Sequence, residues 1–190
     1  MRPALFAALL LFASPAAAAE ARHAIFAGGC FWCMESEFEG TPGVLAVTSG
    51  YTGGQMPNPS YHDVGSGNTG HAEAVQVDYD PDKVSYKQLL DIYWSNIDPT
   101  DAGGQFADRG SQYRTEIFVN NDEERQLAEA SKQAKEAKLH TPIATKISPA
   151  GAFYPAEDYH QDYAKNNPVH YNAYKYGSGR VKRLKELNKN

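Results

Sequence analysis

The stretch Gly28-Gly29-Cys30-Phe31-Trp32-Cys33 contains both cysteines of this 190-residue chain. An apolar run at residues 24–27 precedes it and is typical of a strand. After it, Met34 and Phe38 continue from Cys30 at helical spacing. Two consecutive glycines permit a tight turn between a strand and a helix. We therefore expect Cys30 to lie in the first turn of a helix that follows directly on a strand.

That position predicts a reactive thiol. The unpaired N–H groups and the positive end of the dipole at a helix N-terminus favour a thiolate over a thiol. In such surroundings a cysteine pKa can fall from about 8.5 to roughly 3.5–7.5. Phe31 and Trp32 beside Cys30 provide an apolar wall. The combination indicates a small, partly apolar, electrophilic substrate.

Two cysteines separated by two residues are also found in structural disulfides, zinc sites and haem-attachment motifs. The haem motif requires histidine after the second cysteine, and here that residue is Met34. A structural zinc site needs four ligands, and the chain has no second cysteine pair and no His pair at finger spacing. A disulfide that closes so short a loop adds little stability. The pair therefore favours redox or nucleophilic chemistry, with neither metal nor cofactor.

Residues 1–19 have the pattern of a secretory signal peptide. Arg2 precedes an apolar run at residues 4–13, and an Ala-x-Ala cleavage site ends at Ala19. The apolar run is too short to span a bilayer. We expect an exported protein, periplasmic or secreted, that lacks stable membrane association after cleavage. Its cysteines would lie in an oxidising compartment and depend on a dedicated reductant.

The charge balance excludes some partners. Removal of residues 1–19, which hold one Arg and no acidic residue, changes the formal net charge from −5 to −6. A mildly acidic chain argues against nucleic acid or an anionic membrane as its partner. Residues 20–190 have the length of a single domain, which we expect to be monomeric.

The remaining pattern predicts alternating strands and helices. We expect strands at residues 44–47, 71–79, 113–119 and 145–147, helices at 85–94, 121–138 and 156–165, long polar loops at 50–70 and 98–110, and an irregular tail at 168–190. The order strand, helix, strand, strand, helix, strand is the plan of ferredoxin-like domains. The expected fold class is α+β, a two-layer α/β sandwich with a ferredoxin-like βαββαβ core and long loops at the active site.

Within residues 71–79 the side chains alternate between the two faces of the strand. Glu73 falls on the same face as Val75, Val77 and Tyr79, so it projects from the apolar side near the strand's start. It could meet solvent at the strand end. If it is buried instead, desolvation raises its pKa and holds it protonated, able to donate a proton.

Several motifs, in this order, are similar to those of the A-type peptide methionine sulfoxide reductases. They are Gly29-Cys30-Phe31-Trp32, Gly50-Tyr51-Thr52-Gly53-Gly54, Pro57-Asn58-Pro59-Ser60-Tyr61, Thr69-Gly70-His71-Ala72-Glu73-Ala74-Val75, Gly110-Ser111-Gln112-Tyr113-Arg114 and Tyr154-Pro155-Ala156-Glu157-Asp158-Tyr159-His160. The resemblance covers about residues 25–160. It implies a two-layer sandwich with a ferredoxin-like core, in agreement with the predicted plan.

The resemblance also implies an activity, the thiol-dependent reduction of methionine S-sulfoxide, free or in proteins, to methionine. Cys30 would attack the sulfoxide sulfur, and Glu73 would protonate or hydrogen-bond the oxygen. Tyr61 and Tyr113 would help to hold that oxygen. These donors suit the chemistry, since the oxygen gains negative charge as sulfur is attacked.

Three further positions acquire roles by resemblance. Phe31 and Trp32 would receive the S-methyl group of the substrate, and Asp108 would be a supporting carboxylate near the site. Oxygen transfer leaves a sulfenic acid on Cys30, which a thiol must reduce.

The resolving thiol is the point at which this chain departs from many relatives. Many family members carry resolving cysteines in the C-terminal tail, and this tail has none. Cys33 occupies a position that is often glycine, although variants with Gly-Cys-Phe-Trp-Cys also belong to the family. Cys33 lies about one helical turn from Cys30, within reach of it. We expect Cys33 to form a disulfide with Cys30, which a thioredoxin-like donor then reduces.

Two other functions are compatible with the cysteine pair. A general thiol–disulfide oxidoreductase would use Cys30 and Cys33 but would require neither Glu73 nor Tyr61. An exported binding domain with a structural disulfide would keep its function after reduction.

Overall fold

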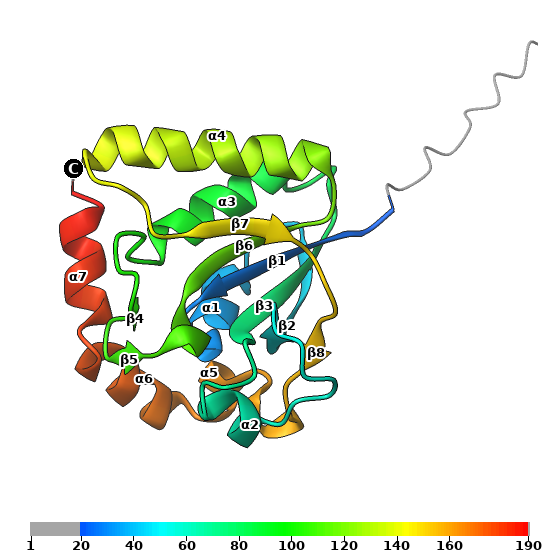
Figure 1. Cartoon of the computed structure of the whole chain (residues 1–190), viewed down its shortest axis with the longest axis vertical. Coiled ribbons are helices and arrows are strands. Elements are labelled where there is room, and N and C mark those ends of the chain that lie inside the picture. Colours follow the sequence, from blue (N-terminus) through cyan, green and yellow to red (C-terminus); the bar gives the residue numbers. More distant parts are fainter. Residues whose placement is uncertain (1–19, 190) are drawn as a thin grey trace, which may run out of the picture.

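A computed structural model describes residues 20–189 of the chain. The predicted signal peptide, residues 1–19, lies outside the described residues. Figure 1 shows a large twisted sheet with helices packed around it, and a separate pair of short strands, β4 (Gly104–Gln105) and β5 (Asp108–Arg109). In spatial order the strands of the large sheet are β7 (Lys146–Pro149), β6 (Thr115–Val119), β1 (Arg22–Gly28), β3 (Ala72–Tyr79), β2 (Val44–Thr52) and β8 (Tyr154–Pro155).

The four central strands follow the ferredoxin-like plan. β3 lies between β1 and β2 and is antiparallel to both, and β6 is antiparallel to the other edge of β1. Two additions extend this core, since β7 runs parallel to β6 and β8 runs antiparallel to β2. The predicted α+β sandwich with a βαββαβ core is confirmed.

The helices begin and end at recognisable signals. They are α1 (Phe31–Phe38), α2 (Tyr61–Gly65), α3 (Tyr86–Ser95), α4 (Asp122–Leu139), α5 (Tyr163–Asn166), α6 (Pro168–Gly177) and α7 (Arg180–Leu187). The Ser85 hydroxyl accepts a hydrogen bond from the Gln88 N–H, and the Ser85 N–H donates to the Gln88 side chain, so a capping box begins α3. The Asn121 side chain caps α4 through the Glu124 N–H.

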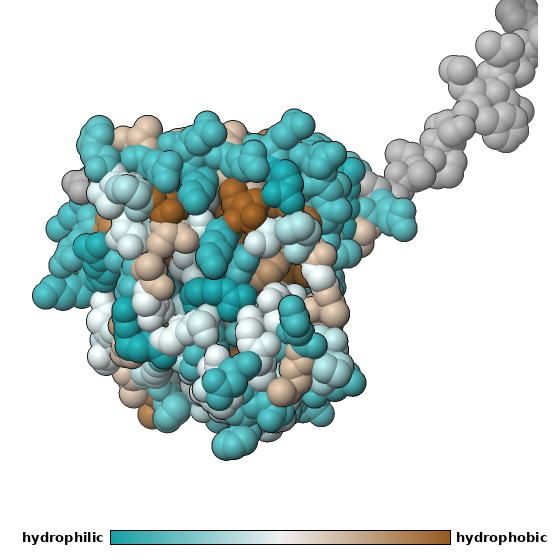
Figure 2. Space-filling view, viewed as in Figure 1, coloured by the Kyte–Doolittle hydropathy of each residue, from teal (hydrophilic) through white to brown (hydrophobic). Residues whose placement is uncertain are grey.

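The main core lies between one face of the sheet and helices α1 and α3. Phe26 of β1 stacks on Phe38 of α1 and on Tyr93 of α3, each with a ring-centroid distance of 5.2 Å. The Tyr93 hydroxyl donates to the Ala27 carbonyl at 2.9 Å, which ties α3 to the end of β1. Helix α4 packs beside α3 (Figure 1), and its outer face in Figure 2 is hydrophilic.

The opposite face of the sheet carries a smaller apolar cluster. Ala72 and Ala74 of β3 lie there with Phe118 of β6, covered by Phe153. Val75, Val77 and Tyr79 of β3 belong to the main core instead. The alternation predicted for this strand is therefore confirmed, and it places Glu73 on the side of the main core.

Two loop and strand predictions were wrong in detail. β2 continues to Thr52, into the predicted loop, because residues 50–52 pair with Ala74, Glu73 and Ala72 of β3. The same predicted loop contains α2, which begins at a capping box between Ser60 and Asp63. The strand predicted from residue 113 begins at Thr115, because residues Ser111–Tyr113 form a 3-10 turn.

The predictions for the C-terminal part were also wrong. Residues 156–165 hold no continuous helix, because Asp162 adopts a left-handed conformation at φ +51° between the 3-10 turn Asp158–His160 and α5. Residues 168–190 were predicted to be irregular, yet α6 and α7 account for most of them. Pro168 begins α6 at a position that suits proline, and Gly179, at φ +80°, separates the two helices.

Candidate active site

The turn between β1 and α1 places Cys30 at the N-cap of α1. Gly29 makes this turn possible, since its φ is +83° and an added Cβ would lie 2.5 Å from the Gln105 Cβ. The Cys30 carbonyl accepts hydrogen bonds from the N–H groups of Cys33 at 3.1 Å and Met34 at 3.3 Å, which start the helix. The Cys30 side chain is 7% exposed.

Cys30 opens into a cavity of about 130 Å³. The residues that line it are Cys30, Phe31, Trp32, Tyr61, Glu73, Asp108, Tyr113 and Tyr174. Seven of these eight residues were predicted from the sequence as site residues. The structure thus brings together the start of α1, α2, β3, β5 (Asp108–Arg109), the 3-10 turn before β6, and α6. Cys33 does not line the cavity.

Glu73 is the carboxyl group nearest to the start of α1. Its side chain is 3% exposed, and its Oε2 accepts a hydrogen bond from the Phe31 N–H at 3.0 Å. Burial, with a smaller contribution from the Asp108 charge, raises the Glu73 pKa to about 8. At neutral pH this carboxyl group is mostly protonated and can donate a proton, which is the buried one of the two alternatives that the sequence left open for Glu73.

Tyr61 and Tyr113 supply two further hydroxyl groups to the cavity. Burial and the nearby Glu73 charge raise the pKa of both, so that each keeps its proton. The Tyr61 N–H donates to Glu157 Oε1 at 2.8 Å, and the other oxygen of Glu157 accepts from the Tyr51 hydroxyl at 2.8 Å. Glu157 therefore fixes the start of α2 against β2.

Trp32 forms the aromatic wall with two residues that the sequence did not reveal. Its ring stacks on Tyr163 with a centroid distance of 3.7 Å and an interplanar angle of 6°. Its indole N–H donates to His160 Nδ1 at 3.0 Å. Burial lowers the pKa of His160, so the ring is neutral and can accept this bond. Trp32 is thus held in one orientation at the edge of the cavity.

The charge distribution over the two cysteines differs from the prediction. Burial, the neighbouring Cys33 thiolate and the Glu73 charge raise the Cys30 pKa well above its usual value. The hydrogen bond from Cys30, together with the Arg180 and Lys175 charges, lowers the Cys33 pKa to about 7. The prediction of a thiolate on Cys30 was wrong, because Cys30 is desolvated and the Phe31 N–H is occupied by Glu73.

Two residues of the C-terminal helices were missed by sequence reasoning. The Tyr174 hydroxyl of α6 donates to Asp108 Oδ2 at the edge of the cavity, and it lies close enough to Cys30 to lower the pKa of that thiol. Arg180, the first residue of α7, is buried beside Met34. The spacing of Tyr171 and Tyr174 after Pro168 was the available signal of a helix.

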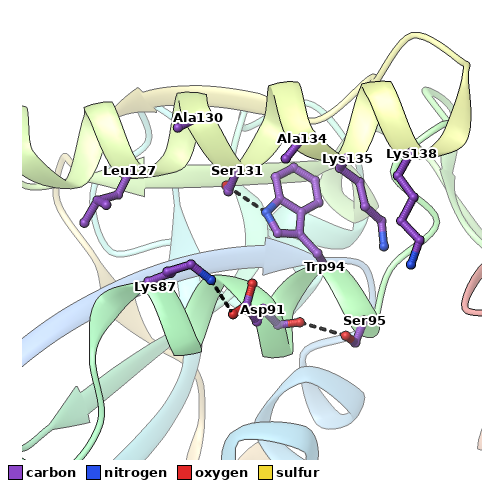
Figure 3. A pocket seen from close by; sticks show the side chains of 10 residues that line it. All are labelled: Lys87, Asp91, Trp94, Ser95, Leu127, Ala130, Ser131, Ala134, Lys135 and Lys138. Carbon is purple, nitrogen blue, oxygen red and sulfur yellow. Dashed lines mark hydrogen bonds and ion pairs between the residues drawn. The ribbon is translucent and has the colours of Figure 1, made fainter.

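A second depression, of about 380 Å³, lies between α3 and α4. Figure 3 shows Trp94 of α3 pointing toward α4, where its indole N–H donates to the Ser131 hydroxyl at 2.9 Å. Lys135 and Lys138 stand at one end of it. It contains no cysteine and no buried carboxyl group, so it does not offer the sulfur chemistry of the first cavity.

Neither a metal site nor a membrane-spanning element is found in residues 20–189. No cluster of three or more His, Cys, Asp or Glu side chains in this range could hold a metal ion. Within the same range, every helix is too short or too polar to cross a bilayer.

A known protein family matches almost all of the described chain. A family described as peptide methionine sulfoxide reductase matches residues 22–190. Peptide methionine sulfoxide reductase MsrA of Bacillus licheniformis is 57% identical over 159 residues, which are 83% of this chain and 88% of that protein.

Solved structures agree with this match. Mxr1 from Saccharomyces cerevisiae in reduced form superposes with a TM-score of 0.75 and 32% identity, over 78% of this chain and 87% of that one. The same yeast protein in complex with Trx2 superposes with a TM-score of 0.55 and 25% identity, over 76% of this chain and 85% of the yeast chain.

Proposed function

This chain belongs to the peptide methionine sulfoxide reductase family, and we propose that it acts on the S epimer through a sulfenic acid on Cys30. The reduction of methionine sulfoxide follows from membership of the family. The proposed attack by Cys30 is supported by one observation, namely that the cavity beside it gathers three protonated groups, Glu73, Tyr61 and Tyr113. The S epimer is proposed from the resemblance to the family.

In the first step the sulfoxide lies with its methyl group against Phe31 and Trp32 and its oxygen toward the three donors. The Cys30 sulfur attacks the sulfoxide sulfur, and Glu73 gives its proton to the oxygen as negative charge develops there. The S–O bond to the substrate breaks, methionine leaves and the oxygen ends on Cys30 as a sulfenic acid. The proton balance closes because the proton of the Cys30 thiol replaces the proton that Glu73 gave.

In the second step Cys33 attacks the sulfur of the sulfenic acid. A Cys30–Cys33 disulfide forms, the S–O bond breaks and the oxygen leaves as hydroxide, which takes a proton from Glu73 or from solvent to become water. The lowered pKa of Cys33 supplies the thiolate that this step requires. A thioredoxin-like dithiol then reduces the disulfide. The complex of the related yeast protein with Trx2 supports a donor of this class.

The export of the protein belongs to the same proposal. Residues 1–19 have the composition of a cleaved signal, and the cysteine pair would then work in an oxidising compartment. N-terminal sequencing of the protein recovered outside the cytoplasm should begin at Glu20. An intact N-terminus in the cytoplasmic fraction would contradict export.

A general thiol–disulfide oxidoreductase is not favoured, since the buried Glu73 and the tyrosine hydroxyls have no role in that reaction. The decisive assay incubates the purified protein with each epimer of methionine sulfoxide and dithiothreitol, and measures methionine. We expect methionine from the S epimer alone. Turnover of neither epimer would reject the assignment, and turnover of the R epimer would reject the proposed stereochemistry.

A further inference from the structure

The two cysteines differ in their access to solvent. Cys30 is 7% exposed and borders the substrate cavity. Cys33 is 0% exposed and lies outside that cavity, on the side of α1 that faces the C-terminal helices. Tyr171, Lys175 and Arg180 of the C-terminal helices lie close enough to Cys33 to lower its pKa. A molecule that enters the cavity therefore reaches the sulfur of Cys30 but not that of Cys33.

The cover over Cys33 is positively charged. Arg180 is 1% exposed, and its Nη2 donates to the Asn96 carbonyl at 2.6 Å and lies 3.7 Å from the Met34 sulfur. Its Nε has no hydrogen-bond partner among residues 20–189, and its charge acts on the Asp108 carboxyl as well as on Cys33. A buried cation is unfavourable unless negative charge lies near it. A thiolate on Cys33 provides negative charge close to it.

Lys175 of α6 adds a second positive charge near Cys33. It is half-buried and pairs with Glu37 of α1 at 2.7 Å, one helical turn beyond Cys33. In the reduced protein the Cys30 thiol is the main group that stabilises a Cys33 thiolate. When Cys30 is itself in a disulfide it can no longer donate, and the charges of Arg180 and Lys175 become the remaining support.

Thiol–disulfide exchange depends on which sulfur is attacked and on which thiolate leaves. A thiolate of lower pKa leaves faster. Attack on Cys33 would require entry beneath α6 and α7 and would expel Cys30, whose pKa is raised. Attack on Cys30 proceeds through the open cavity and expels Cys33, whose pKa is lowered. Access and leaving-group chemistry therefore both favour attack on the Cys30 sulfur.

We infer that the external thiol reduces the enzyme by attacking Cys30 through the substrate cavity, and that the C-terminal helices hold Cys33 as the buried leaving group. The inference rests on the proposed Cys30–Cys33 disulfide. The donor thiolate forms a bond to the Cys30 sulfur, the bond between Cys30 and Cys33 breaks, and Cys33 leaves as a thiolate beside Arg180. The second thiolate of the donor then displaces Cys30, which takes up a proton.

The test uses the whole chain with its disulfide formed by diamide, a step that is independent of methionine sulfoxide. A thioredoxin variant whose second active-site cysteine is serine traps the mixed disulfide, and iodoacetamide blocks the thiol that is released. Glutathione serves as a second donor that needs no protein docking. Tandem mass spectrometry of the peptide that contains both cysteines should find the donor on Cys30 and the alkyl group on Cys33. The donor on Cys33 would overturn the inference.

A competition experiment gives an independent readout. Equilibrium dialysis first measures the binding of methionine sulfoxide to the oxidised enzyme, which cannot reduce it; the bound molecule should occupy the route to Cys30. It should therefore slow the formation of the mixed disulfide, competitively with the donor thiol. No slowing at concentrations that saturate the reduced enzyme would overturn the inference.

The positioning role of Arg180 is tested by Arg180→Met, with Arg180→Lys to restore the charge and Lys182→Gln as an exposed control on the same helix. If the leaving sulfur responds as strongly as an attacking one, reduction of the disulfide should slow about threefold for each unit gained by the Cys33 pKa. The first turnover with methionine sulfoxide monitors folding. Equal reduction rates for Arg180→Met and Lys182→Gln would remove Arg180 from the inference.

The outcomes separate this inference from the proposed cycle. If methionine sulfoxide leaves a lone sulfenic acid, seen as a gain of one oxygen, the proposed cycle fails, yet the diamide-made disulfide still reports which sulfur is attacked. If neither methionine sulfoxide nor diamide produces the disulfide, both the proposed cycle and this inference fail.

Discussion

Replacement of Glu73 by glutamine should make the enzyme slower and its fold more stable. Glutamine has the shape of a protonated carboxyl group, and its side-chain oxygen can keep the hydrogen bond from the Phe31 N–H. It cannot give up a proton to the sulfoxide oxygen. Loss of a general acid reduces rates by about 10²–10⁴, so we expect a decrease of this size in the first turnover.

The stability change follows from the raised pKa of Glu73. The pKa is 4.5 without perturbation and about 8 in the folded protein. A carboxyl group raised in this way gives its full contribution to stability below pH 4.5 and loses it progressively as the pH rises through 8. At pH 7 the loss is about 3 kcal/mol, because each pH unit above 4.5 accounts for about 1.4 kcal/mol. Glutamine does not ionise and avoids this loss.

Urea unfolding of both proteins at pH 5 and pH 7 measures this effect. The gain in unfolding free energy of Glu73→Gln over wild type should be about 3 kcal/mol at pH 7 and below about 1 kcal/mol at pH 5. Glu129→Gln, the same change on the exposed face of α4, should give no gain at either pH. Equal stability of Glu73→Gln and wild type at pH 7 would refute the account of Glu73 as a buried, protonated group.

The same group should shape the pH dependence of the reaction. The wild-type rate of the first turnover should fall above about pH 8, as Glu73 loses its proton. Glu73→Gln should lack this fall. If the variant keeps it, another group in the cavity is responsible.

Three other substitutions test the remaining roles. Cys30→Ser should abolish methionine formation in a single turnover, with an unchanged circular dichroism spectrum; a folded variant with wild-type rate would reject Cys30 as the nucleophile. Cys33→Ser should keep the first turnover but accumulate a sulfenic acid and stall with thioredoxin, and recycling at full rate would make Cys33 a bystander. Trp32→Phe loses the hydrogen bond to His160, so KM for methionine sulfoxide should rise about fivefold, the equivalent of about 1 kcal/mol, with a smaller effect on kcat; an unchanged KM would show that this bond does not position the wall.

The sequence was informative where local rules decide the outcome. Alternation along residues 71–79 placed Glu73 on the core face, and the cap at Ser85 marked the start of α3, because both signals depend on neighbours a few residues away. The resemblance to known reductases added Tyr61, Tyr113 and Asp108, to which local patterns assign no catalytic role. The structure places all three of these residues in one cavity with Cys30.

The C-terminal helices α6 and α7 could not be predicted from such local signals. Their apolar positions are few, and Gly177-Ser178-Gly179 is typical of a loop. They are stabilised by tertiary packing, since the side chains of Tyr171 and Leu187 are buried against the rest of the molecule. The prediction for the Cys30 thiol failed for a related reason. A helix N-terminus can be recognised from the sequence, but the desolvation of the thiol depends on α2, β3 and α6, which fold over it.

The wrong predictions for residues 168–190 and for the Cys30 thiol therefore have the same cause, namely tertiary packing around the cavity, and this packing has a chemical consequence. Because the cavity is desolvated, Glu73 and Cys30 both keep their protons before substrate binds, and of the two cysteines Cys33 is the one that ionises more readily. Arg180 and Lys175, both from the tail, favour that arrangement. A protonated Glu73 is what a sulfoxide oxygen requires as it gains charge, and a Cys33 thiolate is what a sulfenic acid on Cys30 requires next. In the proposed cycle the C-terminal helices would therefore keep Cys33, the second nucleophile, covered until Cys30 has reacted.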